Sequence, residues 1–149
     1  MTIEQILEAA AQRAQKMALP YAGALLPKET YQLWREAPGA TLVDVRTRAE
    51  WYWVGRIPGA VEIELQTYPG TQPNPSFLAE LDQLVAKTGP VMFICRSGGR
   101  SHHAAALATH YGYTHCFNVL EGFEGDRDAN GHRNTVNGWR AAGLPWSQG

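Results

Sequence analysis

The sequence predicts an α/β domain of three layers, in which helices cover both faces of a mostly parallel central sheet, with a helical extension at the N-terminus. Short β-rich runs alternate with longer stretches whose apolar residues recur at helical spacing, which is the order typical of parallel sheets. The chain has 149 residues, of which 44% are hydrophobic and 18% charged. These values indicate one globular domain that is large enough to bury a core.

The N-terminal part carries an amphipathic pattern, followed by a stretch rich in turn-forming residues. Residues 3–17 place apolar side chains at helical spacing, so we expect a helix that docks on the domain or on a second copy. A helix lying on a membrane surface is the weaker alternative, because its polar face mixes acidic and basic residues. Proline and glycine interrupt residues 18–27, which we expect to be a linker. The sequence thus predicts an extension and linker over 1–26 and the domain over 27–149.

The remaining elements follow in order along the domain. Pro27 is expected to open a short helix that runs to about Glu36. The β-rich runs predict strands at TLVDV (41–45), VEIEL (61–65), VMFI (91–94) and HCFNVL (115–120). Helices are expected at 46–55, 76–87, 101–111 and 136–142, with a polar stretch at 121–135 before the last of them.

Charge and cysteine content exclude several classes of protein. Thirteen basic and fourteen acidic residues leave a net charge of −1, which argues against nucleic acid or an anionic membrane as a partner. The two cysteines, Cys95 and Cys116, make no disulfide framework, and Cys116 is expected to be inert core. Polar residues interrupt the N-terminal apolar positions, and no run is long enough to span a membrane. We therefore expect a soluble, cytoplasmic protein whose thiols stay reduced.

The most informative stretch is FICRSGGRS (93–101), in which a cysteine directly follows an apolar run. Gly98 and Gly99 let the chain curl so that backbone N–H groups and a helix N-terminus face Cys95. Arg96 and Arg100 add two permanent charges that can hold an anion. A buried, unreactive cysteine is the usual alternative, but paired arginines and glycines have no packing purpose there. The pattern favours a nucleophilic thiolate with an anion-binding loop.

CRSGGRS (95–101) resembles the active-site loop of rhodaneses, the thiosulfate sulfurtransferases. Other stretches resemble further motifs of that family, in the same order along the chain: LVDVRTRAEW (42–51), GRIPGA (55–60), NVLEGF (118–123) and WRAAGLPW (139–146). The resemblance covers about residues 27–146. It implies a rhodanese-like fold and a sulfurtransferase that carries sulfur as a persulfide on Cys95, without a cofactor or a metal.

The resemblance also implies roles for the residues around Cys95. The substrate-binding loop would comprise Arg96, Ser97, Gly98, Gly99, Arg100 and Ser101. Asp44 and Arg46 match the family's D-x-R and are expected to form buried ion pairs that brace the loop, with Glu50 as a weaker candidate. Arg56 stands where the family usually has histidine, so it either adds positive charge near the mouth or caps a turn.

Loop length distinguishes two chemistries on this fold. Four residues separate Cys95 from Arg100, whereas phosphatase-type loops have five, which widens the ring of amides to take a phosphate or arsenate group. The shorter loop favours sulfur transfer from a thiosulfate-like anion to cyanide or a thiol, with a protein as a further candidate acceptor. A phosphatase or arsenate reductase stays open as an alternative, as does a non-catalytic persulfide carrier or protein-binding module.

Two further patterns, a pair of histidines and a stretch similar to a calcium loop, also have an ordinary structural explanation. His102 and His103 lie about 100° apart on a helix and are expected to be solvated, since sulfur transfer needs no base. DRDANG (126–131) matches the opening of a calcium loop, but Asn137 occupies the twelfth position, where the full motif requires glutamate. We therefore expect a polar turn and no metal site there.

Overall fold

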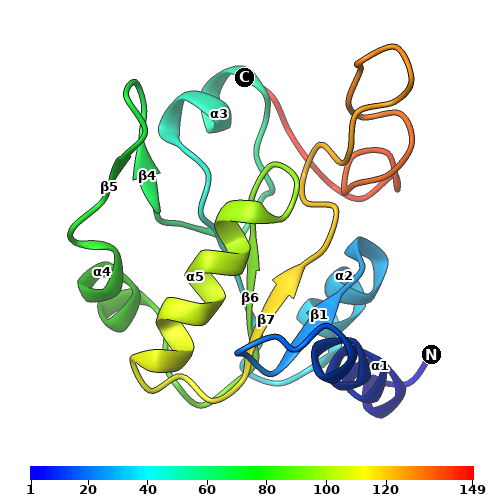
Figure 1. Cartoon of the computed structure of the whole chain (residues 1–149), viewed down its shortest axis with the longest axis vertical. Helices are drawn as coiled ribbons and strands as arrows, with labels where there is room; N and C mark the ends of the chain where they lie inside the picture. The colour runs from blue at the N-terminus through cyan, green and yellow to red at the C-terminus, as the bar shows by residue number, and fades with distance from the viewer.

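The computed structural model describes all residues 1–149 and has a five-stranded central sheet in the order β1-β7-β6-β2-β3 (Figure 1). Every pairing in this sheet is parallel, which confirms the predicted α/β class. Its strands are β1 (Gly23–Leu25), β2 (Thr41–Asp44), β3 (Val61–Glu62), β6 (Val91–Ile94) and β7 (Cys116–Val119). A separate antiparallel pair is formed by β4 (Gln66–Thr67) and β5 (Gln72–Pro73).

The chain has five helices, four of which cover the two faces of this sheet. They are α1 (Ile3–Lys16), α2 (Pro27–Glu36), α3 (Arg48–Trp53), α4 (Phe77–Leu84) and α5 (Gly99–His110). Buried side chains of α4 and α5 belong to one core cluster, and those of α1 and α2 belong to the other. The molecule therefore has the three predicted layers. No helix combines the length and the apolar character that crossing a bilayer requires.

Strand β6 shows how the sequence separates the two layers. Val91 and Phe93 face the α4 and α5 cluster, while Met92 and Ile94 face the α1 and α2 cluster. All four are buried, because side chains alternate along a strand that is covered on both faces. Cys95 continues this alternation, so its side chain points toward the face that α5 covers.

The predicted linker at 18–27 is wrong in one respect, because it contains strand β1. This strand pairs with β7 and extends the central sheet on its edge. Three residues are too few to show a β-periodicity, which is why the sequence did not indicate a strand. Gly23 is required there, since an added Cβ would lie 2.8 Å from the Cβ of Ala10 and 2.9 Å from the Phe117 ring.

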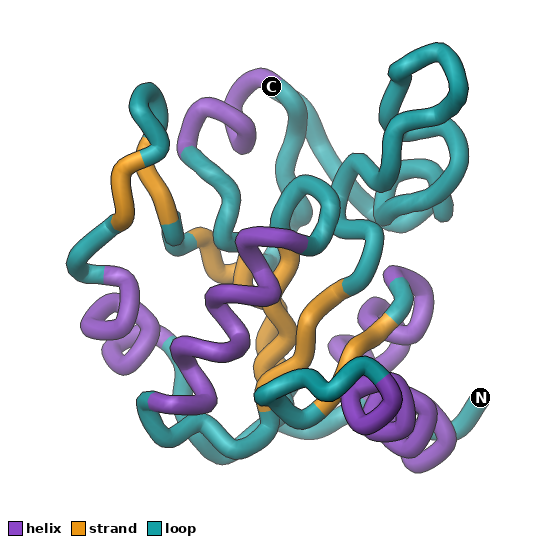
Figure 2. Tube along the Cα trace, viewed as in Figure 1, coloured by secondary structure: helices purple, strands orange, loops and turns teal.

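The last predicted helix, at 136–142, is also wrong, and these residues form consecutive turns instead. Figure 2 shows the chain after β7 as loop throughout. Gly138 has a φ of 104°, which no helix accommodates. The N–H groups of Gly138 and Trp139 donate to Glu121 and to the carbonyl of Gly122, and so they cannot support a helical ladder. The polar stretch before them determines their conformation.

Candidate active site

Cys95 lies where strand β6 ends and the loop leading to α5 begins. Its side chain is 1% exposed, and its Sγ accepts a hydrogen bond from the Gly98 N–H at 3.1 Å. The Ser101 Oγ lies 3.2 Å from the same sulfur. Gly98 has a φ of 107°, which glycine adopts without strain, and it leads directly into α5. Gly99, in contrast, needs no positive φ and is the first residue of α5.

The sulfur forms part of a small cavity of about 190 Å³. Its lining is Cys95, Arg96, Ser97, Gly99 and Arg100, so five of the seven predicted loop residues border one cavity. The other two, Gly98 and Ser101, contact Sγ directly. Because α5 has 12 residues and begins at Gly99, the partial positive charge of its N-terminus lies beside this cavity. The loop brings together every residue that the sequence assigned to it.

Asn118 in β7 holds both residues that contact the sulfur, a role that the sequence alone did not indicate. Its Oδ1 accepts a hydrogen bond from the Ser101 hydroxyl at 2.6 Å, and its Nδ2 donates to the Gly98 carbonyl at 3.2 Å. It is 4% exposed. A buried polar residue must find hydrogen-bond partners, so an asparagine within the apolar run CFNV was the available signal.

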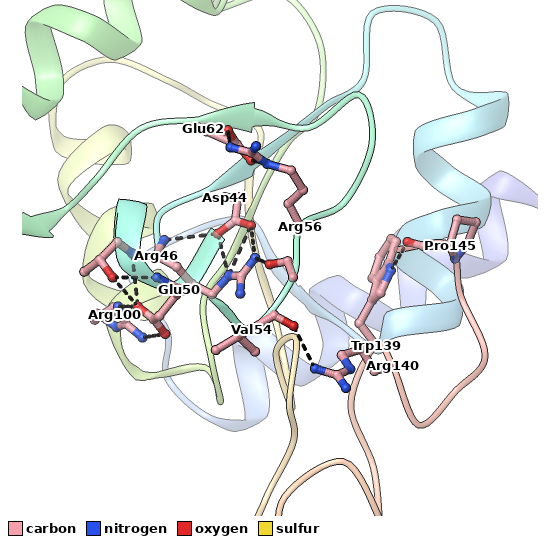
Figure 3. A network of polar contacts seen from close by, with 12 residues as sticks. Asp44, Arg46, Glu50, Val54, Arg56, Glu62, Arg100, Trp139, Arg140 and Pro145 are labelled. Atoms are coloured by element: carbon pink, nitrogen blue, oxygen red, sulfur yellow. Dashed lines mark hydrogen bonds and ion pairs between the residues drawn. The ribbon is translucent and has the colours of Figure 1, made fainter. Parts of the chain in front are cut away.

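The two loop arginines have different surroundings. Arg100 donates from Nη1 and Nη2 to the two carboxylate oxygens of Glu50 in α3, at 2.7 and 2.9 Å (Figure 3). Burial alone would raise the pKa of Glu50, but the hydrogen bonds and charge of Arg100, helped by Thr47, lower it to about 2. Arg96 is exposed and forms no ion pair or hydrogen bond through its side chain. The loop therefore presents one uncompensated cation.

Asp44 and Arg46 form the expected buried ion pair, at 2.8 Å and with both side chains 0% exposed (Figure 3). Arg46 also donates to the Gly55 carbonyl at 2.8 Å, and its guanidinium lies 4.1 Å from the centroid of the Phe123 ring. The pair contacts the cysteine loop only indirectly, because the Phe123 N–H donates to the Cys95 carbonyl at 2.8 Å. The Asp44–Arg46 pair is therefore connected to the cysteine loop through Phe123.

Comparison with known proteins decides the family. The model of the rhodanese-like domain matches residues 26–129. The chain belongs to the rhodanese-like domain family. The crystal structure of Rv0390 from M. tuberculosis is 46% identical, with a TM-score of 0.80, over 87% of this chain and 99% of that one. An uncharacterized protein of Rickettsia rickettsii is 35% identical over 79% of this chain and 91% of its own length.

A more distant neighbour of this rhodanese-like chain supports the fold alone. The polysulfide-sulfur transferase homodimer of Wolinella succinogenes is 20% identical, with a TM-score of 0.59, over 100% of this chain and 95% of that one. The shared architecture agrees with the rhodanese-like fold.

Two basic residues near the loop of the rhodanese-like domain are already engaged. Arg56 pairs with Glu62, with the Nη2 to Oε1 distance at 2.7 Å, and so it adds little net charge at the mouth. The His102 Nδ1 lies 2.8 Å from the Tyr21 hydroxyl, whereas the sequence predicted a solvated ring. Burial raises the pKa of Tyr21, and its contact with Asn118 opposes that rise. His103 is exposed, as expected.

The remaining predicted residues lie outside the active-site loop. Cys116 is 0% exposed, and burial raises the pKa of its thiol to about 11, which agrees with inert core. In the stretch that resembles a calcium loop, Asp128 accepts hydrogen bonds from Asn130, His132 and Thr135. These bonds lower the pKa of Asp128 and make it the centre of a polar turn.

Proposed function

We propose that this protein is a sulfurtransferase that moves a sulfane sulfur from a thiosulfate-like donor to a thiophilic acceptor through a persulfide on Cys95. One observation supports this most directly. The Cys95 Sγ lies at the N-terminus of α5, with the Gly98 N–H at 3.1 Å and the Ser101 Oγ at 3.2 Å, in a cavity bordered by an unpaired Arg96. The Gly98 N–H and the N-terminus of α5 stabilise negative charge on sulfur, whether that sulfur is a thiolate or the end of a persulfide.

The reaction takes place in two displacements. The Cys95 thiolate attacks the outer sulfur of thiosulfate, whose S–S bond breaks, and the bonding electron pair leaves with sulfite. Arg96 holds the sulfonate oxygens of the donor. An acceptor, cyanide or a thiolate, then attacks the outer sulfur of the persulfide, and the electron pair of the broken bond returns to Cys95. Neither leaving group needs a proton, so the loop requires no general acid.

The surroundings of Arg100 also favour sulfur over phosphate. A phosphatase-type loop uses its arginine to hold the oxyanion, but here both terminal nitrogens of Arg100 are hydrogen-bonded to Glu50. With four residues between Cys95 and Arg100, the loop also has fewer amides to surround a tetrahedral group. We assign Arg100 to the shape of the loop and Arg96 to the donor.

Mass spectrometry and steady-state assays test this function together. Incubation with thiosulfate should add about 32 Da, one sulfur atom, to the peptide that contains Cys95. Cys95→Ser should abolish transfer to cyanide, and Cys116→Ser should keep most of it. Hydrolysis of an aryl phosphate without any sulfur uptake would instead identify a phosphatase. Sulfur uptake without turnover, until a second protein is added, would identify a persulfide carrier.

A further inference from the structure

A second cavity, which we call the acceptor groove, adjoins the cysteine loop. It has a volume of about 520 Å³ and lies between α3, the segment of β4 and β5, and the loop. Figure 1 shows α3 and the β4–β5 pair at the same edge of the molecule. Arg96 and Arg100 border both this groove and the smaller cavity that contains Cys95. A molecule in the groove is therefore next to the sulfur that is to be transferred.

The charges of the groove are unevenly compensated. Four of its lining residues are fully charged groups, and two of these, Glu50 and Arg100, neutralise each other. The other two are Arg96 and Glu124, whose side chains form no ion pair or hydrogen bond within the protein. Their backbones are adjacent, because the Glu124 N–H donates to the Arg96 carbonyl at 3.0 Å. The groove thus offers one cation and one anion that have no partner within the protein, on residues whose backbones are adjacent.

This pair of charges does not suit thiosulfate. A dianion in the groove would be repelled by Glu124, whereas the smaller cavity around Cys95 has no acidic residue in its lining. The groove is also much larger than a small inorganic anion needs, and its volume falls in the range of about 300–1,000 Å³ that is usual for organic ligands. Its occupant should therefore carry both charges and an organic body.

The walls of the groove fit such a body. Trp53 on α3 is 72% exposed and Tyr68, after β4, is 63% exposed, although aromatic side chains of this size are usually more buried. Ala49, Val54 and four neutral polar residues complete the lining. The hydroxyls of Thr47 and Thr67 donate within the protein, whereas the side chains of Gln66 and Thr71 are left without a partner there. Neutral hydrogen-bonding groups in a lining that also contains exposed aromatic rings are suited to amide groups.

We propose that the acceptor groove binds the thiol that takes sulfur from Cys95, and that this thiol is a zwitterionic, peptide-like molecule of low mass. Its carboxylate pairs with Arg96 and its ammonium with Glu124. The thiolate attacks the outer sulfur of the persulfide, an S–S bond forms on the acceptor as the one on Cys95 breaks, and the thiol proton goes to water. The acceptor leaves as a persulfide. The transfer of sulfur to this thiol rests on the proposed function, whereas the binding of the thiol in the groove does not depend on it.

The test uses glutathione as the acceptor and S-methylglutathione, which has no free thiol, as a binding probe for the full chain. Calorimetric titration should show saturable binding of S-methylglutathione. Glu124→Gln and Trp53→Ala should each weaken that binding about fivefold, and each should lower kcat/KM for glutathione more than kcat/KM for cyanide. Glu4→Gln and Tyr52→Ala are matched controls, since both residues are exposed and neither lines the groove. These controls should bind the probe like the wild-type chain.

Thiols that carry only one of the two charged groups test the ammonium and the carboxylate one at a time. Cysteamine has the ammonium alone and 3-mercaptopropionate the carboxylate alone, so both should be poorer acceptors than glutathione. The inference is overturned if S-methylglutathione does not bind, if Glu124→Gln and Trp53→Ala bind it unchanged, or if all three thiols react equally. Failure of the proposed function is distinct, because Cys95 would then take no sulfur from thiosulfate whatever the groove binds.

Discussion

Among single residues, the two arginines of the cysteine loop differ in their partners: Arg100 is paired with Glu50, whereas the Arg96 side chain has no partner within the protein. Arg96 has no partner, so Arg96→Ala should raise KM for thiosulfate at least about tenfold, the effect of losing a hydrogen bond to a charged group. The free energy of unfolding should stay unchanged. Arg96→Lys, which keeps the charge, should recover part of the loss. Equal KM values for the three proteins in steady-state assays would place the sulfonate elsewhere.

Arg100→Ala should behave differently, because it leaves the Glu50 carboxylate without its bidentate partner. The variant should lose stability as well as activity, on the order of 1–3 kcal/mol in unfolding free energy. Chemical denaturation measures this loss. A fully stable Arg100→Ala protein that fails only in thiosulfate binding would show that Arg100 serves the donor directly.

Ser101 acts on the sulfur itself. Its Oγ lies 3.2 Å from Sγ, and its hydroxyl, which donates to Asn118 in this structure, can turn to donate to a negatively charged sulfur. Ser101→Ala should therefore shorten the lifetime of the Cys95 persulfide by about 2- to 10-fold, the effect of one neutral hydrogen bond. Mass spectra taken at intervals after thiosulfate is removed follow that lifetime. Thr109→Ala is the control, because it removes a hydroxyl from the same helix without a contact to Sγ. A persulfide equally stable in all three proteins would exclude this role for Ser101.

Between elements, the Glu50–Arg100 pair connects α3 to α5 and should make stability depend on pH. The pKa of Glu50 is about 2 in the folded chain and 4.5 ordinarily, so its contribution is complete above pH 4.5 and is lost as pH falls toward 2. Glu50→Gln should therefore cost about 2 kcal/mol at pH 7 and less at pH 3. Denaturation curves at both pH values measure the difference. Glu62→Gln, in the more exposed pair with Arg56, should cost less than about 1 kcal/mol.

Local patterns in the sequence were predictable, whereas contacts between elements distant in the sequence were not. The cysteine loop was predictable because strand, glycines, arginines and helix start follow one another within about ten residues. The partners of that loop are distant in sequence: Glu50, 50 positions before Arg100, was indicated only by the family resemblance, and Asn118, 17 positions after Ser101, was not indicated as a partner at all. Spacing along the chain contains no information on such pairs. The absence of the helix at 136–142 has the same origin, because Glu121 engages the Gly138 N–H from outside that segment.

For the whole molecule, the N-terminal extension is part of one structure with the domain. The family match begins at residue 26, yet β1 precedes it and pairs with β7. Buried Ile6 and Ala10 of α1 share a core cluster with Met92 and Ile94 of β6, the strand that leads into Cys95. Tyr21 reaches His102 on α5. Folding of the extension and of the active-site strand should therefore be one cooperative event.

Substitutions in α1 test that cooperativity without removing any part of the chain. Ile6 is 0% exposed, so Ile6→Ala should lower the unfolding free energy of the whole molecule by about 2–5 kcal/mol. Ile3, on the same helix, is only partly buried, and Ile3→Ala should cost clearly less. Fluorescence and far-UV circular dichroism should report one coincident transition for each variant. If α1 were an independent appendage, Ile6→Ala would melt the helix early and leave the main transition where it is in the wild-type chain.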